Sequence, residues 1–224
     1  MNKSIIIIAL VNVFFALQMN AQFNKSTRFG ITGYSTSSVE GTIAPGSSVE
    51  SYWVVPPIFL ESERRFAKIF TFGTEMTYGK QRFDVSTPYS NQSLTSTLAA
   101  IEAQLKVSLT IVRMIEIYGQ ASIGYAHAFI KSDVSDASGF DLDSSFDFGS
   151  YTTSGSVGAS IIFGGSFGAF VEVGALNATT TKTMAELYDD SAPAGASSSQ
   201  IGLPNEPVSN TTGFAKIGLV FAIK

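Results

Sequence analysis

Few residues of this chain carry the side chains that enzymatic catalysis most often uses. Its 224 residues include no cysteine and a single histidine, His127. Thiol chemistry, disulfides and zinc–thiolate sites are therefore excluded, and any triad or dyad that depends on histidine must use His127. Ala128 and Phe129 follow it, so no serine stands at His-x-Ser spacing. We interpret His127 as an isolated polar residue beside Tyr125 and Phe129 rather than as a catalytic base.

Acidic residues gather in one segment, which holds five aspartates: Asp133, Asp136, Asp141, Asp143 and Asp147. Clustered carboxylates suit Ca²⁺, but the central glycine and terminal glutamate of an EF-hand loop are missing. We interpret the segment as a solvated surface loop. The glycines form neither a dinucleotide fingerprint nor a Walker loop, so the sequence predicts no cofactor and no metal. A net charge of −4 and a pI near 5.0 argue against nucleic acid as a partner.

The beginning of the chain has the order of a secretory signal peptide. Lys3 gives it a basic start, residues 5–17 are almost entirely apolar, and the stretch ends in Ala21. The apolar run is shorter than the roughly 20 residues that a membrane-spanning helix needs. We therefore expect residues 1–21 to be removed on export, and residues 22–224 to form one exported domain.

The elements that position the remaining side chains are strands, because polar and apolar residues alternate with a period of two. Between Ala99 and Ile111 every odd position is apolar, whereas the even positions include Glu102, Gln104 and Lys106. Helical spacing would mix these two sets. The sequence predicts eight strands, near residues 27–37, 50–60, 70–78, 99–111, 115–125, 151–163, 167–175 and 215–223.

The predicted connections alternate between short and long. Short turns are expected near residues 61–65, 112–114 and 164–166, and long loops near residues 39–49, 80–94, 131–145 and 182–210. In the two most regular hairpins we expect Ile111 opposite Ile115 and Phe163 opposite Phe167, which keeps the apolar faces on one side. Short turns at one end and long loops at the other are typical of a bacterial outer-membrane barrel with both termini in the periplasm.

Pro56 and Pro57 interrupt the second predicted strand. A closed barrel has no free edge at which a missing N–H group would be harmless. We therefore expect a β-bulge at these prolines, or a strand that ends before them.

The last predicted strand carries a recognisable pattern. Lys216, Gly218, Phe221 and Ile223 give the order polar, glycine, aromatic, hydrophobic, which resembles the C-terminal β-signal of outer-membrane proteins. With the signal peptide and the strand count, the chain resembles the family of small eight-stranded outer-membrane β-barrels. The resemblance implies an all-β, antiparallel, up-and-down transmembrane barrel. It also implies that the barrel-assembly machinery reads the last strand during insertion, although Lys224 extends the chain beyond the usual aromatic end.

Barrel closure assigns the two faces of the strands different environments. Apolar residues on the outward face require hydrocarbon or another sheet, and eight strands leave an interior just filled by side chains. We expect a polar network inside the barrel, made of Glu75, Glu102, Lys106, Glu116, Glu172 and Lys216. Opposite charges there are expected to pair and plug the lumen. An aromatic girdle is expected where the outer strand ends meet the membrane interface: Tyr78, Phe83, Tyr89, Phe146, Phe148 and Tyr151.

These features favour a non-enzymatic outer-membrane protein with a structural or surface-interaction role, with outer-membrane lipid as its surroundings and an unidentified extracellular ligand. Three alternatives remain open. A passive small-solute channel would use the polar inward face, although aqueous pores need about 16 strands. A lipid-modifying hydrolase would have to use His127. A soluble exported sandwich or lipocalin-like carrier would turn its apolar face inward.

Overall fold

The computed structural model describes residues 25–35, 48–66, 69–86, 90–112, 114–136, 141–163, 166–183, 185–186 and 206–223. The expected signal peptide lies outside the described residues. Within them, no helix is long and apolar enough to cross a membrane.

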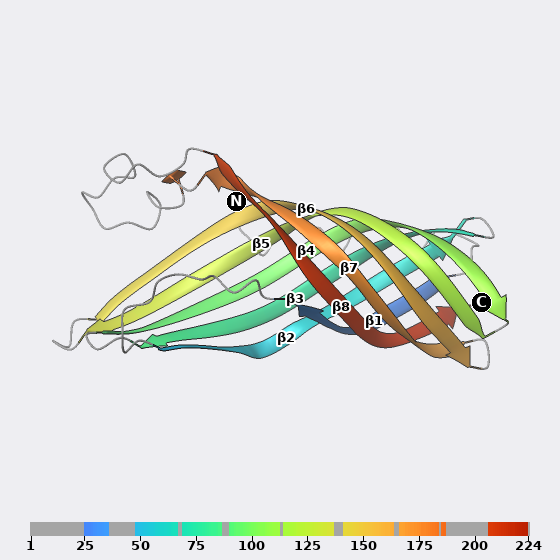
Figure 1. Cartoon of the computed structure of the whole chain (residues 1–224), viewed down its shortest axis with the longest axis horizontal. Helices are drawn as coiled ribbons and strands as arrows, with labels where there is room; N and C mark the ends of the chain where they lie inside the picture. Colours follow the sequence, from blue (N-terminus) through green and yellow to red (C-terminus); the bar gives the residue numbers. More distant parts are fainter. Residues whose placement is uncertain are drawn as a thin grey trace.

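Eight antiparallel strands form one closed barrel, in which each strand pairs with its neighbours along the chain and β1 pairs with β8 (Figure 1). The strands are β1 (Lys25–Tyr34), β2 (Ser48–Arg65), β3 (Phe70–Ser86), β4 (Ser90–Val112), β5 (Ile115–Asp136), β6 (Asp141–Phe163), β7 (Phe167–Thr183) and β8 (Pro207–Ile223). The predicted all-β, up-and-down architecture of eight strands is confirmed.

Short hairpins lie at the end of the barrel where β1 begins and β8 ends, which we call the terminal end. Phe163 pairs with Phe167, as predicted. The other predicted hairpin is wrong by one residue, because Val112 pairs with Ile115 after a register shift beyond Thr110. The turn predicted at residues 61–65 is also wrong, since these residues belong to β2 and the turn follows them.

The strands extend much further than predicted at the opposite end. β4, β5 and β6 have 23, 22 and 23 residues, about twice the 9–11 that a tilted crossing of the bilayer needs. The long loops predicted at residues 80–94 and 131–145 are therefore wrong, because most of these residues continue the ladders. Ser86 pairs with Asn91, and Ser135 pairs with Asp141.

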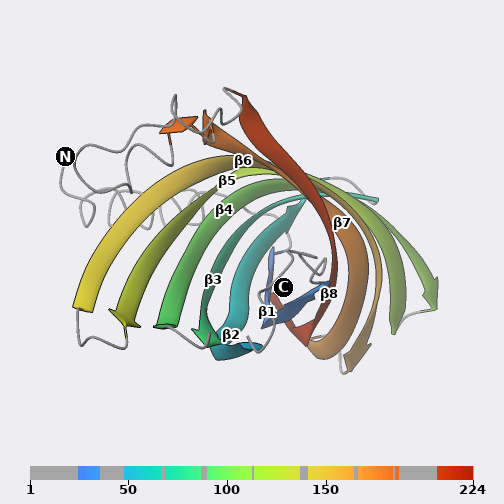
Figure 2. The same cartoon turned by 60° about the vertical axis from the view of Figure 1, so that its left-hand side comes forward.

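Five strands continue beyond the ring that all eight close. Within the described residues, β1 pairs with β2 only from Lys25 to Ile31, and β6 pairs with β7 only over residues 150–163. Figure 2 shows β2–β6 continuing as a curved sheet. We call this part the outer extension: residues 48–57 of β2, 79–86 of β3, 90–100 of β4, 126–136 of β5 and 141–149 of β6.

The prolines of β2 sit where the extension leaves the ring. Register shifts against β3 fall between Trp53 and Val55 and between Val55 and Ile58, so the expected bulge at Pro56 and Pro57 is confirmed. Pairing of β2 with β1 ends at Ile58 within the described chain. The missing N–H groups of both prolines therefore fall where the ladders are already interrupted.

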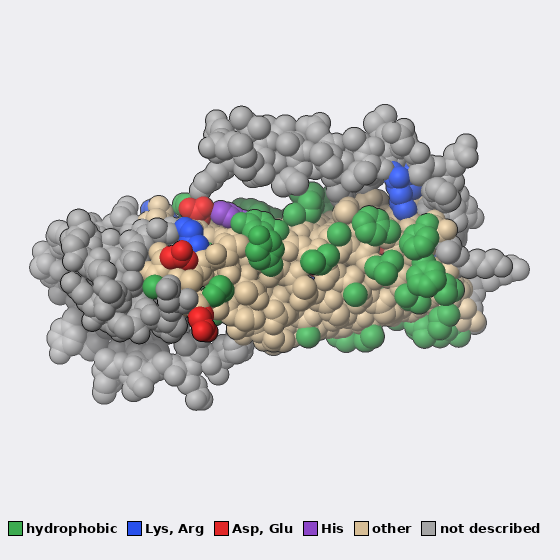
Figure 3. Space-filling view, turned by 90° about the horizontal axis from the view of Figure 1, so that it is seen from above, with side chains coloured by type: hydrophobic (Ala, Val, Ile, Leu, Met, Phe, Trp, Pro, Cys, Tyr) green, Lys and Arg blue, Asp and Glu red, His purple; other side chains and the backbone are tan. Residues whose placement is uncertain are grey.

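Inside the ring, polarity is the reverse of that in a soluble protein. Large apolar side chains point outward and are exposed, among them Phe29, Ile31, Leu60, Phe72, Leu105, Leu109, Ile117, Ile123, Val157, Val171, Ile217 and Phe221. Most buried side chains are polar or charged. On the face shown in Figure 3, hydrophobic side chains spread over the wall, whereas His127 and most of the visible charged side chains lie near the left-hand end.

The polarity of the two faces reverses in the outer extension. Its outward face carries the ion pairs Arg82–Asp84 and His127–Asp147. Most described positions that continue the inward alternation there are apolar: Phe83, Leu94, Leu98, Ala128, Ile130 and Phe148, with Gln81 and Ser96 as polar exceptions. The girdle prediction is therefore wrong for Phe83 and Phe148, which face inward. Tyr78 and Tyr151 do face outward and are exposed, whereas Tyr89 and the side chain of Phe146 lie outside the described part.

The closing seam between β8 and β1 depends on glycine. Gly218 lies opposite Gly30. A Cβ atom on Gly218 would overlap the carbonyl oxygen of Phe29 and lie 2.9 Å from the Cα atom of Gly30. At Gly155, on the exposed face of β6, a Cβ atom would meet nothing within 4 Å.

We expect Gly218→Ala to destabilise the barrel by about 1–3 kcal/mol, because the two backbones must move apart at the seam. Gly155→Ala should leave stability within about 0.5 kcal/mol of the parent. Urea unfolding of the two purified variants in detergent micelles measures both changes. Equal stability of the variants would contradict a steric need for glycine at the seam.

Candidate functional site

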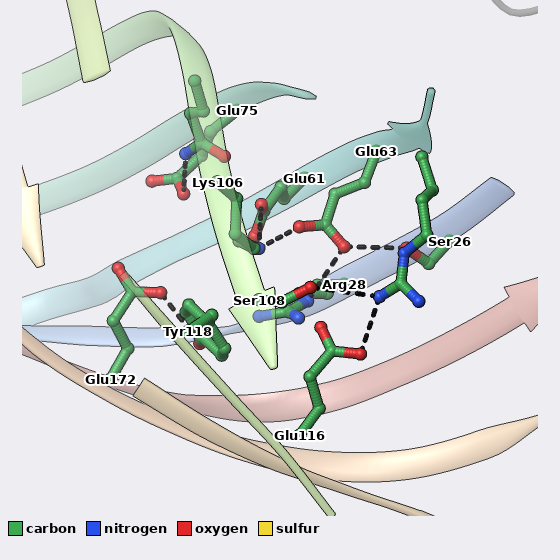
Figure 4. A network of polar contacts seen from close by, with 12 residues as sticks. Ser26, Arg28, Glu61, Glu63, Glu75, Lys106, Ser108, Glu116, Tyr118 and Glu172 are labelled. Atoms are coloured by element: carbon green, nitrogen blue, oxygen red, sulfur yellow. Dashed lines mark hydrogen bonds and ion pairs between the residues drawn. The ribbon is translucent and has the colours of Figure 1, made fainter. Parts of the chain in front are cut away.

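Charged side chains from seven strands meet inside the ring. We call this set the inner network: Arg28, Glu61, Glu63, Arg65, Glu75, Glu102, Lys106, Glu116, Glu172 and Lys216. Strand alternation turns these residues inward, and Figure 4 shows most of them converging from different strands.

Lys106 is the centre of one half of the network. Its ammonium group donates to Glu61 Oε1 at 3.0 Å and also bonds to Glu63. Glu63 accepts a further hydrogen bond from Ser26 at 2.7 Å and forms an ion pair with Arg28, whose Nε lies 3.1 Å away. Lys106, Glu61, Glu63 and Arg28 are each at most 4% exposed, so their charges rely on one another rather than on water.

Lys216 organises the other half. Its Nζ atom lies 2.7 and 2.8 Å from the two carboxylate oxygens of Glu75 and 3.7 Å from Glu172. Gln104 and Thr77 donate to the same Glu75 carboxylate, at 2.8 and 3.1 Å. Glu75 is thus held by side chains from β3, β4 and β8.

Tyr118 connects the two halves. Its hydroxyl donates to Glu172 at 3.0 Å, while Arg28 and Lys106 each lie 4.6 Å from the ring centroid. Such cation–π contacts strengthen when they are desolvated. Phe170 also lies under Arg28, at 4.9 Å. The aromatic rings therefore occupy the space between the charges and contact them directly.

Two carboxylates lie at the margins of the network. Glu116 pairs with Arg65 Nη2 at 2.7 Å near the terminal end, where Arg65 also donates to Ser108. Glu102, on the side of the outer extension, accepts from Ser122 at 2.6 Å and from Thr152 at 3.1 Å. Within the described residues, Glu102 has no cationic partner.

All six residues expected in a polar network face the inside of the ring: Glu75, Glu102, Lys106, Glu116, Glu172 and Lys216. The structure brings Lys216 to Glu75 and Glu172, whereas Glu102 and Glu116 are held by residues outside that set. Sequence reasoning missed four members of the inner network, Arg28, Glu61, Glu63 and Arg65, and it also missed Tyr118, which connects the two halves. Glu61 and Glu63 had been assigned to a turn, although they continue the inward alternation of Phe59, which is 3% exposed.

The residues of the expected assembly signal take different positions on β8. Lys216 points inward to Glu75, and Gly218 lies at the seam. Phe221 points outward, where it stacks on Phe29 with a centroid distance of 5.9 Å and contacts Phe167 at 5.3 Å. Ile223 pairs with Lys25 through the backbone, and its side chain lies outside the described part.

His127 has an acidic partner that the sequence did not predict. Its Nε2 atom lies 3.0 Å from Asp147 Oδ2, and both side chains are more than a third exposed on the outward face. Within the described residues, no hydroxyl group contacts His127. The pair thus contains the base and its acidic partner of a triad but not the nucleophile.

The predicted aspartate loop does not exist as a loop. Asp133 and Asp136 belong to β5, and Asp141, Asp143 and Asp147 belong to β6. Asp133 pairs directly with Asp143 in the ladder. Of the five, only the side chain of Asp147 is described. No group of three or more His, Cys, Asp or Glu residues in the described ranges is arranged to hold a metal ion.

Comparisons with known proteins return outer-membrane barrels of low sequence identity. No family model matches the chain, and no curated protein matches it. The outer membrane protein OprG of Pseudomonas aeruginosa is 11% identical, with 90% of this chain and 96% of OprG covered and a TM-score of 0.43. The attachment invasion locus protein Ail of Yersinia pestis is 12% identical, with 91% of this chain and 100% of Ail covered and a TM-score of 0.41. The outer membrane protein AlkL is 11% identical, with 91% of each chain covered and a TM-score of 0.43.

Removal of Lys106 tests the energetic role of the inner network. Lys106→Met leaves Glu61 and Glu63 buried without their shared cation, so we expect a destabilisation of about 3–5 kcal/mol. Arg82→Met removes the cation of an exposed ion pair in the outer extension, and its effect should stay below about 1 kcal/mol. Urea unfolding in lipid vesicles compares the two variants. A loss for Lys106→Met no larger than that for Arg82→Met would show that the network does not hold the ring together.

Proposed function

We propose that this chain is a non-enzymatic, integral protein of the bacterial outer membrane, exported by its N-terminal signal peptide. The observation that carries this proposal is the outward face of the ring. Exposed Phe, Ile, Leu and Val side chains cover it, while charged side chains are buried inside. Outward apolar side chains on a closed barrel are stabilised by hydrocarbon, and closure satisfies the backbone hydrogen bonds that hydrocarbon leaves unpaired.

The same observation argues against a soluble lipocalin-like carrier. Such a carrier would turn its apolar residues inward around a ligand. Here the inner side of the ring contains Lys106, Glu61 and Glu172, each buried to 2% exposure or less, while Ile123 and Val157 point outward and are more than 60% exposed.

We further propose that the lumen of the ring is closed and that the role of the protein is structural or surface-interacting. The inner network and the rings of Phe59, Tyr118 and Phe170 fill the middle of the ring, and Phe59 packs edge-on against Phe170 at 5.8 Å. Charges that depend on one another for solvation cannot separate easily to admit solutes. The outer extension would then be the part that meets partners outside the cell.

The exposed position of Phe221 supports a role for β8 in assembly. Its ring contributes to the apolar wall at the terminal end without contacting the inner network. We propose that Lys216, Gly218, Phe221 and Ile223 together form the signal that the barrel-assembly machinery reads.

A fractionation experiment tests membrane residence. We expect the protein in outer-membrane fractions, and we expect the unboiled form to migrate differently from the boiled form on a detergent gel, because a closed barrel resists detergent until heated. Recovery from the soluble periplasm, with identical mobility before and after boiling, would contradict the proposal.

Electrical recording tests the closed lumen. In planar bilayers the purified protein should show no reproducible conductance steps, because the inner network and its aromatic rings occupy the ring. Steps of constant size that appear only with the protein would favour the passive channel instead. Vesicles without protein are the matching control.

Phe221→Ala tests whether Phe221 is recognised by the barrel-assembly machinery or only packs against its neighbours. Loss of the side chain lowers stability by about 1.5–3 kcal/mol, the free energy of transferring a Phe side chain from water to an apolar environment. We expect refolding into detergent to remain near normal but outer-membrane yield in cells to fall severalfold. Phe29→Ala is the matched control, since it removes the same stacked pair without changing β8. Equal losses for the two variants in cells would leave Phe221 as a packing residue only.

A further inference from the structure

The outer extension has an apolar inner face directly above the inner network. Along β4, the successive inward positions are Leu94, Ser96, Leu98 and Ala100, followed toward the ring by Glu102. On β5, Ala126 lies opposite Ala100 and Ala128 lies opposite Leu98. A largely apolar surface, interrupted by Ser96 and by Gln81 opposite it on β3, therefore leads down to Glu102.

Small residues surround that carboxylate. Gly124 lies opposite Glu102, and a Cβ atom there would come 2.7 Å from the Glu102 Cγ atom. Glycine at this position lets the Glu102 side chain lie across β5, toward Ser122 and Thr152, which donate to its two oxygens. The side chain is only partly buried.

The charges of the inner network do not balance. It has four basic members, Arg28, Arg65, Lys106 and Lys216, against six glutamates. Within the described residues, Glu61, Glu63, Glu75, Glu116 and Glu172 each have a cation within ion-pair distance. Glu102 is the carboxylate without one. It also stands directly opposite Glu75 in the ladder, and like charges in such a pair repel.

We propose that Glu102 and the inner face of the outer extension bind an amphipathic cation, an ammonium group that carries an alkyl or aryl tail. The ammonium group lies against Glu102 and supplies the missing positive charge. The tail lies along Ala100, Leu98 and Leu94 of β4 and along Ala126 and Ala128 of β5. A neutral apolar molecule would leave Glu102 uncompensated, and a purely ionic ligand would leave the apolar face unused.

The expected affinities follow from the separate contributions of the ammonium group and the apolar tail of the ligand. A low-dielectric wall strengthens the attraction between the ammonium group and the carboxylate, and the tail contributes roughly 0.8 kcal/mol for each methylene group that it buries. Glu102→Gln removes the charge but keeps the shape of the side chain, with an amide oxygen that can accept from one of the Ser122 and Thr152 hydroxyls and an amide N–H that can donate to the other. It should therefore fold like the parent and lose only the ionic part of the binding.

The test uses the full-length protein in lipid nanodiscs with hexyltrimethylammonium as the probe, measured by titration calorimetry against empty nanodiscs. We expect saturable binding to the parent and at least a tenfold weaker affinity for Glu102→Gln. Asp84→Asn is the matched control, because it removes a carboxylate from the outward face of the same extension, and its affinity should equal that of the parent. Heat-dependent gel mobility verifies that both variants are folded.

Two further probes distinguish the ionic and apolar contributions. Tetramethylammonium, which lacks the tail, and hexanol, which lacks the charge, should each bind at least tenfold more weakly than hexyltrimethylammonium. The proposal is overturned by equal affinity of the parent and Glu102→Gln for the probe, by hexanol binding as tightly as the cation, or by a signal no greater than that of empty nanodiscs.

Discussion

Closure of the barrel with eight strands is the constraint that determines how the side chains inside this protein are arranged. Eight strands leave room for side chains but not for a wide column of water, so inward charges depend on ion pairs or hydrogen bonds from the other inward side chains. Lys106 and Lys216 form such pairs in the two halves that Tyr118 connects, each joining carboxylates from other strands. The same closure brings the backbones of β1 and β8 so close that both facing positions, Gly30 and Gly218, lack side chains.

A reversal of polarity along the strands divides the molecule into two parts. In the ring, apolar residues face outward and charges face inward, whereas in the outer extension ion pairs such as His127–Asp147 face outward and Leu98 and Phe148 face inward. Each arrangement suits a different solvent, hydrocarbon around the ring and water around the extension. The extension therefore combines a mostly polar outside with a largely apolar inside, the combination that the proposed binding of an amphipathic cation requires.

The sequence predicted the ring better than the extension, for a physical reason. A pattern of alternating residues with the apolar ones outward identifies strands only in the part suited to hydrocarbon. It therefore located the eight strands but ended them where the polarity of their two faces reverses. The polar residues of 80–86 and 131–136 resembled loops because their strands continue beyond the apolar belt. Glu61 and Glu63 were missed because the run of charged residues from Glu61 to Arg65 resembles a turn. The ion pairs themselves depend on the curvature that brings distant strands together, which local spacing does not specify.

Site-specific lipid contact tests most directly whether the reversal of polarity marks the boundary of the bilayer. The chain has no cysteine, so single spin labels can be attached at Ile123→Cys and Thr97→Cys, two outward positions on either side of the reversal. In reconstituted vesicles, the label at position 123 should collide mainly with oxygen dissolved in the lipid, and the label at position 97 mainly with a water-soluble nickel chelate. Equal preference of both labels for the nickel chelate, or for oxygen, would contradict the account.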